Sequence, residues 1–142
     1  MTEWATDERS TPEPTTIVKA YTRLYSDADG HSRFEDVELP AKTGGVIESD
    51  LVATLADPIA AETVVFRNVL HEASDSEPHN APRRQFIIQI TGWCEIETST
   101  GEVRRFGPGE VLLVEDLDGR GHITRADESG ERRTLLITLR TE

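Results

Sequence analysis

Two histidines and one glutamine are the residues of this chain whose types and placement best suit a metal or ligand site. His79 opens the stretch HNAPRRQFIIQITG, Gln85 follows six residues later, and His122 ends the loop LDGRGH. A divalent transition metal is typically held by imidazole nitrogens together with an anionic carboxylate. His79 and His122 supply two nitrogens, whereas the neutral amide oxygen of Gln85 leaves the metal charge uncompensated. The residues therefore predict either a weakly held divalent metal or two pocket histidines that hydrogen-bond a ligand.

The run RQFIIQI, residues 84–90, is expected to be a strand that carries polar side chains into an interior. Side chains two residues apart on a strand point the same way, so Gln85 should share its face with Arg83, Ile87 and Gln89. The three other apolar residues of the run then pack on the opposite face: Phe86, Ile88 and Ile90. Buried glutamines need hydrogen-bond partners, which a ligand-filled cavity provides more readily than a dry core.

Thr124 and several arginines extend the candidate site. Thr124 lies two residues after His122 and should share its face. The arginines Arg67, Arg83 and Arg84 are candidates for binding a ligand carboxylate, because a guanidinium group binds a carboxylate in bidentate fashion. The alternative is that they form ion pairs with acidic residues on the protein surface. We therefore predict Arg83, Gln89 and Thr124 as ligand-binding residues. The pair Glu115–Asp116, just before the loop, could orient His122, act as a general base or cap the loop.

Short strand-like runs separated by turn residues make up most of the chain. Residues 1–15 are polar and acidic and are expected to form a disordered tail, followed by one domain over 16–142. The segment around 46–62 is ambiguous, with a short helix near 59–62 or further irregular strands. Even spacing of strands and turns predicts an all-β sandwich or barrel. The expected strands are 16–25, 33–39, 63–70, 84–90, 93–98, 102–106, 110–116, 122–126 and 132–141.

Two segments resemble the paired signatures of the cupin family of small β-barrels. In the first, His79, Gln85 and Gly92 fall at the spacings of a His-x-His, Glu, Gly motif; in the second, Gly109 precedes a strand and LDGRGH ends in His122. The resemblance covers roughly residues 63–141, and FGPGEVLLVED is its most specific piece. Four family positions ligate a divalent metal, but here the second histidine is Ala81 and the glutamate is Gln85.

The resemblance implies a single-domain, cupin-like antiparallel β-barrel (a double-stranded β-helix, or jelly roll) that binds a small organic molecule. His79, Gln85 and His122 would be the metal ligands, with one divalent ion (Fe, Mn, Ni, Cu or Zn) or none. An enzyme would be a metal-dependent dioxygenase, isomerase or decarboxylase; a protein of another class would bind or sense a ligand without catalysis. A homodimer is also implied, in which strands such as 16–25 cover exposed edges of the partner's sheet.

The charge of the chain restricts its partners. The 142 residues carry 27 acidic and 15 basic side chains, a formal charge of -12. Nucleic-acid backbones and anionic membrane surfaces both attract positive footprints, so we expect neither as a partner. The acidic, polar N-terminus does not resemble a signal peptide, and no apolar run is long enough to span a membrane. A cytoplasmic protein is therefore expected.

Overall fold

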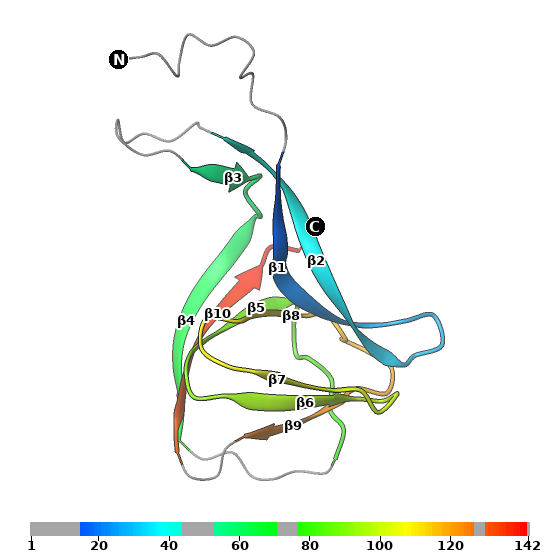
Figure 1. Cartoon of the computed structure of the whole chain (residues 1–142). Helices are drawn as coiled ribbons and strands as arrows, with labels where there is room; N and C mark the ends of the chain where they lie inside the picture. The colour runs from blue at the N-terminus through cyan, green and yellow to red at the C-terminus, as the bar shows by residue number, and fades with distance from the viewer. Residues whose placement is uncertain (1–14, 44–52, 71–76, 127–129, 142) are drawn as a thin grey trace, which may run out of the picture. The chain divides into compact units, whose positions relative to one another are not determined.

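The computed structural model describes residues 15–43, 53–70, 77–126 and 130–141, and all regular structure in these ranges is β (Figure 1). The all-β prediction is confirmed. The short helix considered near 59–62 was wrong, because strand β4 begins at Ala61. The predicted tail, residues 1–15, lies outside the described residues except for Thr15, which begins the first strand.

The strands are β1 (Thr15–Ser26), β2 (Ser32–Thr43), β3 (Thr54–Ala56), β4 (Ala61–Val69), β5 (Gln85–Thr91), β6 (Cys94–Thr98), β7 (Val103–Phe106), β8 (Val111–Val114), β9 (His122–Ala126) and β10 (Arg132–Leu139).

The chain forms two compact units. The smaller one comprises Met1–Ala20 and Glu38–Pro58, and in its described part β3 pairs antiparallel with the end of β2 over Ala41–Thr43. The larger one comprises Tyr21–Val37 and Ile59–Glu142. The candidate site residues all belong to the larger unit. No candidate membrane-spanning helix occurs in the ranges that the structure describes.

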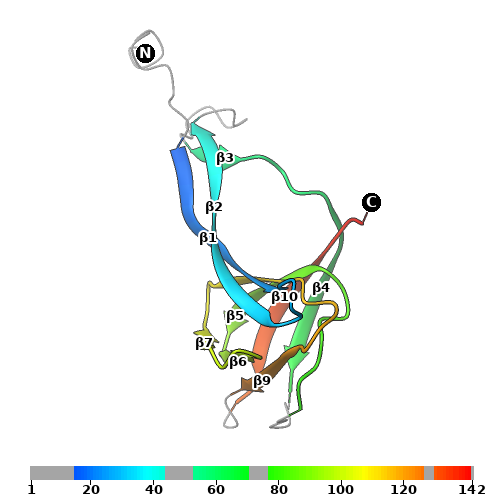
Figure 2. The same cartoon turned by 90° about the vertical axis from the view of Figure 1, so that its right-hand side faces the viewer.

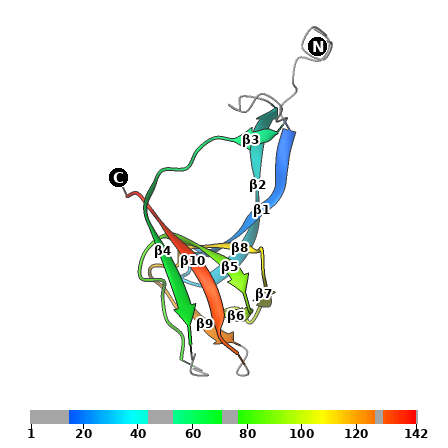
Figure 3. The ribbon, with the colours of Figure 1, turned by 90° about the vertical axis from the view of Figure 1, so that its left-hand side faces the viewer.

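The principal sheet of the larger unit runs in the order β2-β1-β8-β5-β10-β4, to which β1 and β2 contribute the parts within Tyr21–Val37 (Figure 3). The pairs β8–β5, β5–β10 and β10–β4 are antiparallel, although none of them joins strands that are consecutive in the sequence. The pair β1–β8 is parallel, with Thr22–Leu24 opposite Leu112–Val114. This part of β1 therefore pairs within its own chain, where it covers the edge of β8.

A second sheet, in the order β7-β6-β9, faces the principal sheet (Figure 2). The core is made by buried side chains from both sheets, which burial of apolar area holds together. The two sheets pack face to face over this core as in a β-sandwich, and in the described residues they are not joined into a continuous barrel. The core residues are Leu24, Ala81, Cys94, Ile96, Phe106, Leu112 and Val114.

The two faces of the principal sheet differ in character. Directly paired residues point to the same side of a sheet, and one cross-strand row, Arg67–Thr134–Gln89, is polar and faces the second sheet. The adjacent rows on the other face are apolar. They consist of Phe66–Leu135–Ile88 and Val64–Ile137–Phe86, all exposed or half-buried.

Candidate functional site

A cavity of about 110 Å³ lies between the two sheets of the larger unit. Strands β5 and β8 contribute one wall, β6 and β9 contribute another, and β4 and β10 add the two arginines. Its lining is apolar at several positions and polar at seven: Arg67, His79, Gln85, Gln89, His122, Thr124 and Arg132. The expected alternation along β5 is confirmed at Gln85, Ile87 and Gln89, and that along β9 at His122 and Thr124.

A short backbone bridge brings His79 and His122 together. The His79 N–H donates to the His122 carbonyl at 2.9 Å, and the His122 N–H donates to the His79 carbonyl at 2.9 Å. Their ring centroids are 4.6 Å apart. Gly121 permits this approach: its φ is +75°, and a Cβ there would lie 2.5 Å from the His79 carbonyl oxygen. A glycine beside the site is therefore required by the close packing of two backbones.

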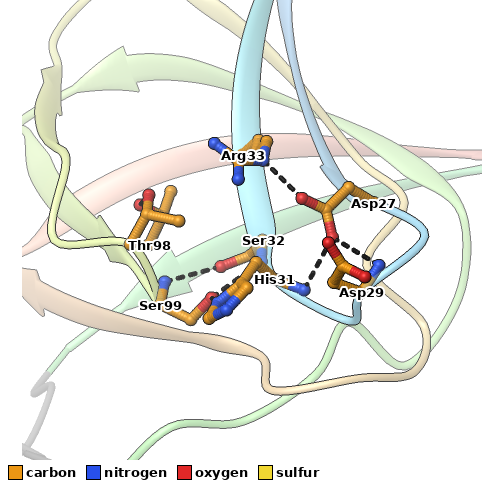
Figure 4. A network of polar contacts seen from close by, with 8 residues as sticks. Asp27, Asp29, His31, Ser32, Arg33, Thr98 and Ser99 are labelled. Carbon is orange, nitrogen blue, oxygen red and sulfur yellow. Dashed lines mark hydrogen bonds and ion pairs between the residues drawn. The ribbon is translucent and has the colours of Figure 1, made fainter.

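The start of β2 fixes the loop that carries His122. The Ser32 hydroxyl, which is fully buried, donates to the Gly121 carbonyl at 2.8 Å. Ser32 and Ser99 also exchange hydrogen bonds, each backbone N–H donating to the other's hydroxyl oxygen at 2.8 Å (Figure 4). The turn before β2 is held by Asp27, whose carboxylate accepts from the N–H groups of Asp29 and His31. This polar network anchors the backbone next to His122.

Asp116 orients the His122 ring. The Asp116 Oδ2 atom lies 2.5 Å from His122 Nδ1, and both side chains are buried. A carboxylate can only accept, so Nδ1 carries a proton and Nε2 is the nitrogen left for the cavity. Of the alternatives for Glu115–Asp116, the structure has Asp116 orienting the histidine. Asn80 Nδ2 and the Ala81 N–H both donate to the Asp116 carbonyl, which fixes the acid in place.

Two arginines, Arg67 and Arg132, also line the cavity and hydrogen-bond to residues of β10 and β5. Arg132, which is 6% exposed, donates from Nη1 to Gln89 Oε1 at 3.3 Å, and Gln89 Nε2 donates to Cys94 Sγ at 3.3 Å. Arg67 Nε donates to the Thr134 hydroxyl at 3.1 Å. Gly92 makes room for this arrangement, because its φ is +77° and a Cβ there would lie 2.5 Å from Arg132 Cβ.

The structure thus brings together five of the six predicted site residues: His79, Gln85, Gln89, His122 and Thr124. Arg83 is not among the lining residues and is exposed, because β5 begins only at Gln85 and the strand alternation does not extend back to it. Arg84 is directed to Glu115 instead. Sequence reasoning missed Arg132, although the required glycine at 92 was a signal that another chain segment approaches closely there.

The donor set does not fit a tightly held metal. Among the described residues, no group of three His, Cys, Asp or Glu side chains is arranged to hold an ion. Beside His79 and His122, the described lining offers no carboxylate, and Arg67 and Arg132 line the same cavity; its other donors are Gln85, Gln89, Cys94 and Thr124. Two guanidinium groups oppose a cation electrostatically, and a neutral amide does not compensate its charge.

Glu115, next to the orienting acid, should make stability depend on pH. Its carboxylate contacts Arg23 Nε at 2.6 Å and also Arg84 Nε. Burial alone would raise the pKa of Glu115, but the hydrogen bonds from Arg84 and Arg23 outweigh it and hold the pKa below its usual value of 4.5. The Glu115 carboxylate therefore takes up a proton more readily in the unfolded chain than in the folded one. Its contribution to the free energy of unfolding is complete above about pH 4.5 and is lost as the pH falls further.

We expect Glu115→Gln to lower the free energy of unfolding by about 1 kcal/mol at pH 7. The difference between wild type and variant should shrink steadily below the usual carboxyl pKa. Urea denaturation of both proteins at a series of pH values measures this difference in the free energy of unfolding. The pH dependence that comes from the other acidic residues is common to both proteins and cancels. A difference that stays constant down to acid pH would contradict this role of the arginine contacts.

Comparisons with known proteins identify no family. No protein-family model matches the chain, and no curated protein matches it. One similar solved structure is described as an ethanolamine utilization protein Q of Salmonella typhimurium. It is 10% identical, with a TM-score of 0.31 over 91% of this chain and 97% of that one. The fold is therefore established by the strand topology, and the function has to be argued from the cavity.

Proposed function

We propose that this protein binds a small organic anion, with its carboxylate held by Arg67 and Arg132. The observation that supports this proposal is the lining of the cavity. In a chain with a formal charge of -12, the described lining residues include two arginines and two histidines but no aspartate or glutamate. A positive interior inside an acidic protein favours an anionic ligand.

The chemistry of the lining supports a carboxylate in particular. Guanidinium groups match a carboxylate with paired hydrogen bonds, and these are stronger in a site shielded from water. Gln85, Gln89 and Thr124 add neutral donors and acceptors for a second polar group of the ligand. The apolar side chains of Ile87 and Leu112 suit a short hydrocarbon portion.

The cavity volume limits the size of the ligand. A cavity of about 150 Å³ holds one benzene molecule, so 110 Å³ suits an acid of a few carbon atoms. Because the donor set does not fit a tightly held metal, no metal-assisted step is part of the proposal. Binding is the function that this geometry supports best.

Calorimetric titration with propionate, pyruvate and 2-oxobutyrate tests the proposal, and propionamide is the matched neutral control. We expect the anions to bind at one site per chain and the amide to bind at least about tenfold more weakly, since a charged hydrogen bond contributes about 1.5–3 kcal/mol. Equal affinity for propionate and propionamide would contradict an anion site, as would the absence of binding by all three acids.

We propose in addition that a second copy of the chain covers the apolar outer face of the principal sheet. Phe66 is 78% exposed and Val64 is 55% exposed there, and the two apolar rows carry no charged residue. Two copies that each carry this net negative charge repel each other over their acidic surfaces. The two uncharged apolar rows are therefore the surface through which two copies can make contact. A second copy offers an equal apolar face, as a two-fold symmetric interface requires.

A further inference from the structure

The pair Asp116–His122 has features that ligand binding alone does not require. Asp116 is fully buried, and its second carboxylate oxygen, Oδ1, has no hydrogen-bond partner among the described residues. An unpaired buried oxygen on a carboxylate is costly, and such groups call for an explanation such as a catalytic role. A histidine that only donates to a ligand would not need a buried carboxylate behind it.

The hydrogen bond determines what the His122 ring can do in the cavity. With Nδ1–H donating to Asp116 Oδ2 at 2.5 Å, Nε2 keeps a lone pair. In the part of the chain that the structure describes, Nε2 has no hydrogen-bond partner. A carboxylate on the opposite nitrogen stabilises the imidazolium that forms when Nε2 takes up a proton. His122 is thus arranged as a proton acceptor, held by its backbone bridge to His79 and by the Ser32–Gly121 hydrogen bond.

The arginines in the same cavity complete the requirements for proton transfer from carbon. Imidazole can remove a proton from carbon only when the developing negative charge is stabilised, as next to a carbonyl group. Arg67 and Arg132 place positive charge within the same 110 Å³ that His122 lines. Fixed positive charge near a developing oxyanion is among the largest contributions to catalysis.

We infer that the protein catalyses metal-independent proton transfer at the carbon next to the carbonyl of a small 2-oxo acid, with His122 as the base and Asp116 as its positioning residue. This inference rests on the anion-binding function proposed above. His122 Nε2 forms an N–H bond as the C3–H bond of the acid breaks. The electron pair forms a C2=C3 double bond, and the carbonyl oxygen becomes an enolate oxygen beside the guanidinium groups. The imidazolium then gives a proton to the enolate oxygen, which completes keto–enol tautomerisation, or exchanges its proton with solvent and returns one to C3, which gives proton exchange; neither route needs an oxidant.

Exchange of carbon-bound protons with heavy water tests this directly. Pyruvate and 2-oxobutyrate are incubated with the full chain in D₂O, and loss of the C3 proton signals is followed by ¹H NMR. The wild type should accelerate exchange above the buffer rate. His122→Gln should lower the enzymatic rate by about 10²- to 10⁴-fold, the usual contribution of a general base. Asp57→Asn, an exposed acid in the smaller unit, is the matched control and should exchange at the wild-type rate.

Asp116→Asn separates positioning from folding. We expect a fall in kcat of about 100-fold or more, with KM for pyruvate changed little, because the binding arginines are untouched. The low-field Nδ1–H resonance of His122 should be present in the wild type and absent from this variant. Circular dichroism and calorimetric affinity for propionate confirm that each variant is folded and competent to bind.

The outcomes distinguish the two proposals. If pyruvate and 2-oxobutyrate bind but do not exchange above the buffer rate, the proton-transfer activity is overturned and anion binding stands. If none of the acids binds, both proposals are overturned. If exchange is accelerated but persists in His122→Gln, the assignment of the base is wrong.

Discussion

Replacing Arg132 with glutamine is expected to weaken propionate binding by about 10- to 100-fold, the loss that follows from removing one charged hydrogen bond. Arg132 is 6% exposed and lines the cavity, with Nη1 donating to Gln89 Oε1. Because Arg132 is buried, its charge is little screened by water, which would strengthen its attraction for the proposed anion. Arg132→Lys should recover part of the affinity, because it keeps the charge but loses the paired hydrogen bonds.

Arg67 is the second proposed anion contact, so the double variant Arg67→Gln/Arg132→Gln should have no measurable affinity for propionate. Arg83→Gln is the matched control, because Arg83 is exposed and is not among the cavity-lining residues. Calorimetric titration with propionate measures all four variants, and urea denaturation shows whether each remains folded. If Arg83→Gln weakens binding as much as Arg132→Gln, the ligand is held outside this cavity.

The polar wall on β5 could be predicted from sequence because strand alternation is a local property. Gln85 and Gln89 lie within one short strand, so their common face follows from the backbone geometry alone. The same rule failed at Arg83, since the sequence did not show that regular extended geometry begins at Gln85. Element ends depend on hydrogen-bond partners in other strands, here β8 and β10, which local sequence does not reveal.

The remaining site residues depend on contacts between distant segments. Arg132 approaches Gln89 across 43 residues of sequence, through the antiparallel pairing of β10 with β5. Asp116 is only six residues from His122, yet the loop between them must turn back for their side chains to meet. The sequence is compatible with an orienting role for Asp116, a general-base role or a loop cap, and only the three-dimensional path of the loop distinguishes among them.

The outer face of the principal sheet leads to a prediction about association. In the rows Phe66–Leu135–Ile88 and Val64–Ile137–Phe86, the most exposed member is Phe66. A few aromatic residues that become buried in an interface contribute about 2 kcal/mol or more each. We therefore expect Phe66→Asp to raise the dimer dissociation constant by at least about 30-fold, because it also places a charge against the partner's apolar face.

Sedimentation velocity over a range of protein concentrations measures this change. Val103→Asp is the matched control: Val103 is also exposed, but it lies on β7 of the other sheet and should leave association unchanged. Added salt should strengthen the wild-type dimer, because it screens repulsion between two chains that each carry a formal charge of -12. A wild-type protein that stays monomeric at high concentration and high salt would contradict the proposal. Equal weakening by Val103→Asp would instead place the interface on another surface.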